Sequence, residues 1–318
     1  MPEVTARGVR FHVQTLDAWE GSPGGAPRRA GAGPAPVVVF VHGLVTDNLS
    51  SFYYTLARPV SAAGAHAVMY DLRGHGRSEC TATGHGAADA ARDLFAILGE
   101  LGHHGPVHLV GNSYGGVVAL NAALARPDRV AGLVLIEAYG PAEHAGEWTE
   151  GMLNSLGRTA LALEYECQAD QLLAMGWRQR GRQAATADAL INGTSLMEDL
   201  AALDPVRPAD LATLSCPVLA VYGEHSDVVD AGTLLLRSVP GCTLHIMAGH
   251  AHTLLREGTE ELLEVMLPWL SHHAGTTVPA ATRSPHAVRP AAPAASAEPA
   301  PSAPFAPPVP PASPAGVR

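Results

Sequence analysis

The chain has 318 residues, of which 47% are hydrophobic and only 16% are charged, and its formal net charge is -10. Such a composition supplies a large buried core, so disorder throughout the chain is excluded. The negative charge offers no counter-ion for a phosphate backbone, and the sequence contains no run of Lys and Arg interleaved with aromatic residues. We therefore expect no nucleic acid among its partners.

The sequence also argues against a membrane protein and against a metal or disulfide scaffold. The N-terminal stretch MPEVTARGVRFHVQ has no basic segment leading into an apolar run, and no apolar run approaches the roughly 20 residues of a bilayer span. Cysteines occur at positions 80, 167, 216 and 242, without C-x-x-C spacing. We expect a cytoplasmic protein with reduced thiols and no membrane partner.

Two segments rich in small residues and proline differ from the rest of the chain. Residues 20–36 lie between two strand-like runs, 9–16 and 37–41, which predicts a long surface loop. Residues 274–318 are dominated by Pro, Ala and Ser and contain almost no large apolar side chain. Because such a segment cannot bury enough surface to offset its ordering entropy, we predict a disordered tail.

Between these segments, short apolar runs rich in β-branched residues alternate with stretches of helical character. The runs are apolar on both faces, which is typical of strands inside a parallel sheet covered by helices. This βαβα alternation predicts a doubly wound α/β domain, whose sites form at the carboxyl ends of the strands. The expected strands are 37–41, 66–71, 107–111, 131–137, 217–223 and 243–247, and the expected helices are 87–101, 114–125, 231–239 and 258–270.

Polar motifs follow several of these expected strands. His42-Gly43 comes after the strand 37–41, and DLRGHGRS begins at Asp71 after the next strand. GNSYG, centred on Ser113, joins a strand to a helix, and this G-x-S-x-G pattern is one in which small residues let a strained turn expose a Ser hydroxyl. Asp227 follows the penultimate strand, and the last strand is followed by His250 and His252.

In this order, the motifs resemble the α/β-hydrolase superfamily, and most of all its capped esterase and thioesterase-like members. The resemblance covers roughly residues 9–271. It implies a doubly wound, mostly parallel sheet, with a hydrolase core over 1–139 and 206–273 and a helical lid over 140–205. It also implies that the backbone N–H groups of Leu44 and Tyr114 form the oxyanion hole.

The chemistry of the residues points the same way. A Ser hydroxyl is a poor nucleophile unless an adjacent base accepts its proton, and an acid must orient that base. The chain order Ser, acid, His matches Ser113, Asp227 and His252, which we take as the catalytic residues. The alternative is a purely structural role, in which Ser113 only begins a helix and His42-Gly43 is only a tight turn.

The choice between the two histidines rests on spacing. His250 follows Gly249, and this Gly-His pair is common in the superfamily. His252 has an acid five positions later, Glu257, which is the spacing that the resemblance implies, so His252 is favoured. No flanking pattern completes a metal site around this H-x-H, and we expect neither a metal nor a cofactor.

The acid has two competitors. We expect Asp230 to cap the helix that begins near 231. Glu137 stands where some superfamily members carry an alternative acid, but we interpret it as an ordinary charged residue at a strand end. Loop-bracing roles are expected for Asp71, Arg73, His75 and Ser78.

The expected lid does not identify a substrate. It mixes medium-sized apolar residues with acids and shows no Arg pair positioned for a phosphorylated or strongly anionic substrate. The sequence therefore predicts a hydrolase of apolar acyl esters or thioesters, acting on a small molecule; a carrier-protein partner is possible but unsupported. Acyl transfer, carbon–carbon bond hydrolysis and a non-catalytic binding protein stay open as alternatives. Candidate lining residues are Trp148, Met152, Tyr165, Met175 and Trp177.

Overall fold

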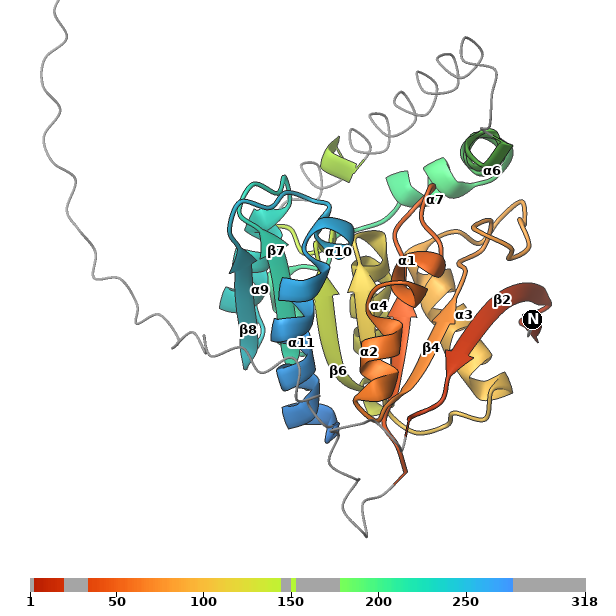
Figure 1. Ribbon diagram of the computed structural model, residues 1–318. Coiled ribbons are helices and arrows are strands. Elements are labelled where there is room, and N and C mark those ends of the chain that lie inside the picture. The colour runs from red at the N-terminus through yellow and green to blue at the C-terminus, as the bar shows by residue number, and fades with distance from the viewer. Residues whose placement is uncertain (1–2, 20–33, 144–149, 153–177, 277–318) are drawn as a thin grey trace, which may run out of the picture. The chain divides into compact units, whose positions relative to one another are not determined.

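The computed structural model describes residues 3–19, 34–143, 150–152 and 178–276, with the backbone alone for 178–184. A single sheet has the strand order β1-β2-β4-β3-β5-β6-β7-β8 (Figure 1). The pairs β1–β2 and β2–β4 are antiparallel, and all the other pairs are parallel. The strands are β1 Glu3–Ala6, β2 Val9–Leu16, β3 Val37–Val41, β4 His66–Tyr70, β5 Val107–Asn112, β6 Val130–Ile136, β7 Val218–Gly223 and β8 Cys242–Met247.

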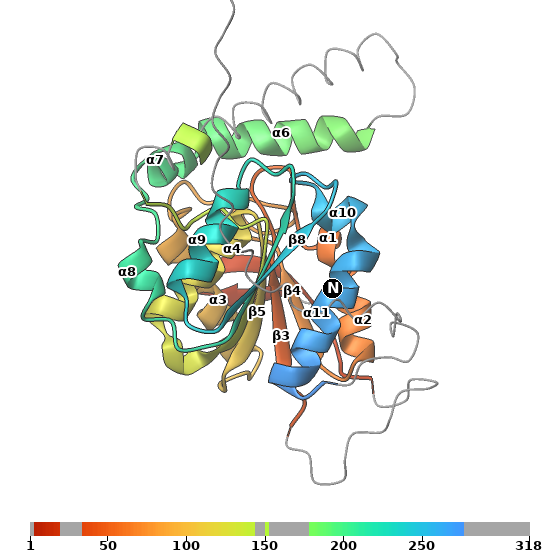
Figure 2. The ribbon, with the colours of Figure 1, turned by 90° about the vertical axis from the view of Figure 1, so that its left-hand side faces the viewer.

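Helices cover both faces of this sheet because its central strands are apolar on both faces. Along β3, Val39 and Val41 belong to one buried cluster, whereas Val38 and Phe40 belong to the other. The first cluster lies under α3 Ala87–Glu100, α4 Tyr114–Ala125 and α9 Val229–Ser238, and the second under α2 Ala57–Ala62 and α11 Thr259–Ala274 (Figure 2). The expected doubly wound α/β architecture is therefore confirmed.

The predicted elements match the observed ones closely in the core. The strand β3 and the helix α4 have the predicted bounds, and the other predicted elements shift by a few residues at their ends. Two short helices, α1 Ser50–Tyr53 and α2, were not expected. The helix α9 begins at Val229, so Asp230 lies in its first turn instead of capping it from outside.

The described part of the expected lid is helical. It contains α6 Arg178–Gly193 and α7 Leu196–Ala201, and a further short helix, α8 Pro208–Leu211, follows it in the segment expected to belong to the core. The Ser195 N–H donates to the Ala82 carbonyl and the His85 N–H to Asp199, so this segment is bound to the loop before α3. Four of the candidate lining residues lie outside the described residues: Trp148, Tyr165, Met175 and Trp177. The predicted loop segment 20–33 and tail segment 277–318 also lie outside them. The division into core and lid stays a prediction.

No helix in the described ranges is both long and apolar enough to cross a bilayer. Three cysteines, Cys80, Cys216 and Cys242, are free.

One buried histidine of the core makes stability depend on pH. His108 of β5 is buried against the edge of the Trp269 ring, and burial lowers its pKa to about 4, with a further contribution from His273. The unfolded chain therefore takes up this proton at higher pH than the folded chain does. The contribution of the neutral His108 ring to stability is complete above about pH 6.5 and is lost as the pH falls toward about 4.

We expect His108→Phe to flatten this dependence. In urea unfolding at pH 8 and at about pH 5, the variant should lose roughly 1–2 kcal/mol less than the native chain on acidification. The exposed neighbour His104 provides the matched control, and His104→Phe should leave the difference between the two pH values unchanged. An equal acid-induced loss in the native chain and in His108→Phe would show that His108 is not the responsible group.

Candidate active site

The turn between β5 and α4 holds Ser113 in a conformation that few residues adopt. Its φ of 54° and ψ of -119° lie outside the helical and extended regions. A β-carbon on Gly115 would overlap the carbonyl oxygen of Val41, and one on Gly111 would overlap the carbonyl of Gly115. Only glycine at these two positions lets α4 pack directly on β3, which raises the Ser113 side chain above the carboxyl end of the sheet.

His252 lies in the loop between β8 and α10 Leu254–Glu257 and reaches back to Ser113. Its Nε2 atom is 3.2 Å from the Ser113 Oγ, and its Nδ1 atom is 3.0 Å from Oε2 of Glu137. A carboxylate at Nδ1 fixes the proton on that nitrogen, which leaves Nε2 free to accept the hydroxyl proton of Ser113. The structure thus brings together Ser113 and His252 as the sequence predicts.

Glu137 follows β6 directly and is fully buried, at 0% exposure. Its φ is 50°, an unusual value for a residue with a side chain. Its Oε1 accepts the Gly223 N–H at 2.5 Å, and its Oε2 accepts the Ser226 hydroxyl. A buried carboxylate is stable only when it is hydrogen-bonded in this way. The structure therefore differs from our interpretation of Glu137 as an ordinary charged strand end.

Asp227 lies on the same side of the imidazole but farther away. Its Oδ1 is 3.7 Å from the His252 Nδ1, and its side chain is 45% exposed. The Tyr139 hydroxyl donates to its other oxygen at 3.3 Å, and the Tyr139 ring packs edge-on against His252. Two carboxylates therefore flank one nitrogen, and Glu137 is the nearer and the more deeply buried of the two.

His250 is directed elsewhere, since its Nε2 lies 3.8 Å from Glu261 at the start of α11. In the parts of the chain that the structure describes, no group of three or more His, Cys, Asp or Glu side chains is arranged to hold a metal ion.

The two expected oxyanion donors lie beside the nucleophile. Leu44 is in the loop after β3, and Tyr114 is the first residue of α4. Neither backbone N–H donates a hydrogen bond to any residue within the described ranges. A β-carbon added to Gly43, the residue before Leu44, would be 3.4 Å from the Ser113 β-carbon. The loop after β3 therefore packs against Ser113. Both donors are therefore available to a developing oxyanion.

Histidines brace the loop that carries Leu44. The Val45 N–H donates to the His75 Nε2 at 2.8 Å, and the Leu72 N–H donates to the His42 Nε2 at 2.9 Å. Burial, followed by the neighbouring His42, lowers the pKa of His75 to about 3. At neutral pH the His75 ring is therefore uncharged and its Nε2 can accept the Val45 N–H, which orients the Leu44–Val45 peptide.

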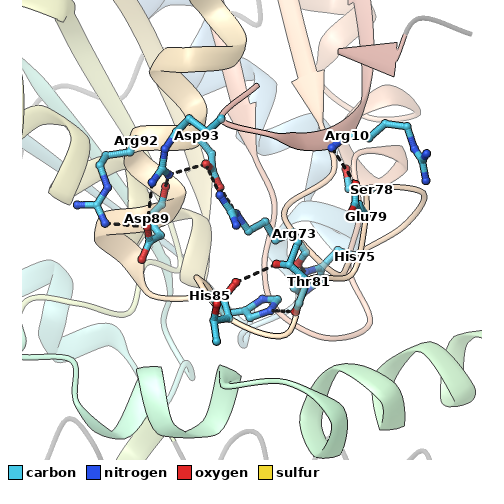
Figure 3. Close-up of polar contacts among 12 residues, drawn as sticks. Arg10, Arg73, His75, Ser78, Glu79, Thr81, His85, Asp89, Arg92 and Asp93 are labelled. Carbon is cyan, nitrogen blue, oxygen red and sulfur yellow. Dashed lines mark hydrogen bonds and ion pairs between the residues drawn. The ribbon is translucent and has the colours of Figure 1, made fainter. Parts of the chain in front are cut away.

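The DLRGHGRS segment is held in turn by ion pairs and hydrogen bonds. Arg73 reaches Asp93 of α3 with Nε–Oδ2 and Nη2–Oδ1 distances of 2.5 and 2.8 Å, and His85 contacts the Thr81 carbonyl nearby (Figure 3). The hydroxyl of Ser78 donates to the Asp71 carbonyl at 2.6 Å. These contacts agree with the bracing role expected for Asp71, Arg73, His75 and Ser78.

A pocket of about 570 Å³ opens above Ser113 and His252. Its apolar walls include Tyr139, Met152 and Leu255. It also contains charged groups at two places, Asp47 beside the Leu44 loop and Arg256 in α10. A small apolar acyl group fits such a pocket next to the nucleophile.

The close packing at the elbow is tested by Gly115→Ala. We expect this change to lower the free energy of unfolding by at least about 3 kcal/mol, because the new methyl group meets backbone that cannot move aside. Gly99→Ala is the matched control: a β-carbon there meets nothing within 4 Å, and alanine in the helix α3 should stabilise by roughly 0.5–1 kcal/mol. Chemical denaturation of both variants measures the difference, and equal stabilities would contradict the proposed close approach.

Comparisons with known proteins agree with this geometry. The model of the alpha/beta hydrolase family matches residues 38–265. RutD of Variovorax paradoxus, whose name carries a provisional assignment as a carbamate hydrolase, is 32% identical over 207 residues, which cover 60% of this chain and 76% of RutD. The 2-hydroxy-6-oxononadienedioate/2-hydroxy-6-oxononatrienedioate hydrolase 1 of Dechloromonas aromatica is 27% identical over 234 residues, which cover 67% of this chain and 79% of the relative.

Among solved structures, a thermophilic esterase from Thermogutta terrifontis superposes with a TM-score of 0.64 at 18% identity, covering 86% of this chain and 98% of the esterase. This similarity concerns the fold. Because the family model spans well over half of the 318 residues, the chain belongs to the alpha/beta hydrolase family.

Proposed function

We propose that this hydrolase cleaves uncharged apolar acyl esters or thioesters through an acyl-enzyme, with Ser113 as nucleophile, His252 as base and Glu137 as the orienting acid. The observation that carries the proposal is the position of the His252 ring, 3.2 Å from the Ser113 Oγ on one side and 3.0 Å from Glu137 on the other. This is the geometry that activates a hydroxyl for attack on a carbonyl.

The reaction has two halves. In the first, Ser113 attacks the carbonyl carbon while its proton passes to the His252 Nε2, and the Leu44 and Tyr114 N–H groups stabilise the oxyanion. The imidazolium then protonates the departing alcohol or thiol, and the acyl group remains on Ser113. In the second half, the neutral His252 accepts a proton from water as the water oxygen attacks the acyl carbon, and it gives this proton to the Ser113 Oγ as the acyl–Oγ bond breaks and the acid leaves.

The choice of Glu137 as acid follows from distance and burial. Charge on a developing imidazolium is stabilised most by the nearest carboxylate in the least solvated surroundings. Glu137 is 3.0 Å from the His252 Nδ1 and fully buried, whereas Asp227 is 3.7 Å away and half exposed to solvent. In this proposal Asp227 acts as a secondary acid, and the sequence-based preference for it is replaced.

The preference for an uncharged substrate rests on Asp47. Its Oδ2 accepts the Gly43 N–H at 2.8 Å, which fixes the carboxylate beside the oxyanion loop and on the wall of the pocket. A carboxylate on the substrate close to the reacting carbonyl would be repelled there. An uncharged acyl group against Tyr139, Met152 and Leu255 meets no such penalty.

Nitrophenyl esters and acyl thioesters of graded chain length test the reaction itself. We expect a burst of product followed by steady turnover, and intact mass spectrometry should find one acyl group on the chain. The variant Ser113→Ala should lose both turnover and the adduct. Substrate turnover without any dependence on Ser113 would refute the proposed nucleophile, and carbon–carbon substrates cleaved in preference to esters would favour that alternative.

A comparison of two isosteric substitutions locates the acid. We expect Glu137→Gln to lower kcat by about three to four orders of magnitude, as loss of a triad acid does, because the amide no longer fixes the proton on Nδ1. The matched change Asp227→Asn should lower kcat less than about tenfold. Steady-state kinetics on one nitrophenyl ester measures both. The opposite ranking would return the role to Asp227.

A further inference from the structure

A second cavity, of about 650 Å³, lies on the other side of the loop that forms the oxyanion hole. Its floor is formed by His12 of β2 and by Asp71 at the end of β4, which are neighbouring antiparallel strands (Figure 1). Tyr53 and Tyr54 form one wall, and Thr186 of α6 also lines the cavity. The proposed reaction uses none of these residues.

His12 and Asp71 form a buried pair. The His12 Nδ1 lies 2.8 Å from the Asp71 Oδ2, and Asp71 also accepts the backbone N–H groups of Leu49 and Arg77. With three N–H donors already on this carboxylate, the geometry fixes the His12 proton on Nδ1. In the neutral ring, the Nε2 atom is then an acceptor.

This acceptor is poorly satisfied within the protein. His12 is only 8% exposed, and the sole described partner of its Nε2 is the Gln14 amide nitrogen at 3.5 Å. That distance exceeds the usual range of about 2.7–3.2 Å for a hydrogen bond from nitrogen. A buried acceptor on a cavity wall gains free energy when a ligand supplies a well-placed donor.

The cavity adjoins the pocket above Ser113. Both are lined by the segment that runs from Thr46 through Asp47 and Asn48 to Ser50, and both reach Tyr54. The Leu49 N–H donates to the Asp71 Oδ1 at 2.8 Å, so the same segment touches the His12 pair. An arm of a substrate held at Ser113 would have to pass Asp47 and Asn48 to reach the second cavity.

We propose that this cavity is a second substrate subsite, which recognises a hydroxyl group at the end of one arm of an ester through the Nε2 atom of His12. The proposal rests on the ester hydrolysis proposed above and names the substrate class more closely. Tyr53 and Tyr54 cover the aliphatic part of the arm, and His12 accepts the hydrogen bond from its terminal hydroxyl.

The charges around the cavity select a neutral donor. A carboxylate on the arm has no proton to donate to the His12 Nε2 at neutral pH, and the lining residues it would meet include Asp47 and Asp71 as well as Arg77. An ammonium group can donate, but both carboxylates of the cavity, Asp71 and Asp47, already accept backbone N–H groups, and dehydrating a cation costs far more than dehydrating a hydroxyl. A hydroxyl supplies the required proton without that cost.

Two pairs of esters test the subsite and identify the arm. One pair is hydroxyhexyl butanoate and heptyl butanoate, in which a hydroxyl replaces a methyl group at the end of the alcohol. The other is nitrophenyl hydroxyhexanoate and nitrophenyl heptanoate, in which the same replacement ends the acyl chain. We expect one of the two pairs to favour the hydroxyl by about tenfold in kcat/KM.

The variant His12→Asn keeps an amide N–H for Asp71 but removes the Nε2 acceptor. It should abolish the preference for the hydroxyl while leaving kcat/KM of the methyl-terminated ester within about twofold of the native value. The control Gln14→Leu removes the neighbouring amide, leaves the acceptor in place and should retain the preference. An unchanged ratio in His12→Asn, or no hydroxyl preference in either pair with the native chain, would overturn the proposal.

A binding measurement separates this proposal from the reaction it rests on. Hexanediol should raise the melting temperature of the native chain more than hexanol does, and His12→Asn should remove that difference. If no ester is turned over but the diol effect depends on His12, the hydrolysis is wrong and the subsite stands. If esters are hydrolysed and the diol and hexanol act alike on both chains, the subsite alone is refuted.

Discussion

The contact between the start of α4 and the end of β3 is the constraint on which the site depends. Helix and strand meet backbone to backbone at Gly115 and Val41, closer than any side chain allows. That approach forces Ser113 into its strained conformation, and the first N–H of α4 has no partner among the residues that the structure describes. The strain is maintained because the surrounding sheet is buried on both faces, so relaxing the turn would break the packing of two clusters.

Around this turn, the charged Glu137 lies behind His252, whereas the histidines that hold the Leu44 loop accept hydrogen bonds as neutral rings. The carboxylate of Glu137 is buried behind His252, where hydrogen bonds from Gly223 and Ser226 offset its desolvation. On the opposite side, His42 and His75 hold the Leu44 loop through acceptor nitrogens, and burial lowers the pKa of His75. The proposed oxyanion hole would therefore use backbone dipoles, which do not depend on protonation near neutral pH.

Much of the fold could be predicted from the sequence because its signals are local. The strands are continuous apolar runs and the helix after Ser113 is a run of Ala, Val and Leu, and their predicted bounds agree closely with the structure. The choice of His252 over His250 came from a five-residue spacing to Glu257, and the structure brings His252 to the nucleophile. The short helices α1 and α2 have only one or two turns, too few to produce a recognisable pattern.

The position of Glu137 and the second cavity depend on contacts between residues far apart in the sequence, which no local sequence pattern predicts. Glu137 becomes buried because Gly223 and Ser226, almost ninety residues later, donate to it. The His12–Asp71 pair forms because β2 and β4 are neighbours in the sheet, although 59 positions separate the two residues and β3 lies between them in the sequence. Sequence order alone ranks Asp227 first, since it follows the strand that usually precedes the acid in this family.

The paired carboxylates beside His252 also bear on how such enzymes diverge. A chain with acids after two adjacent strands can lose either one while the other still lies within 4 Å of the same nitrogen. The orienting role can therefore migrate from one strand to the next by single substitutions, without passing through an ancestor that lacks any acid. An alignment based only on the acid after β7 would then treat residues as equivalent although they have different roles.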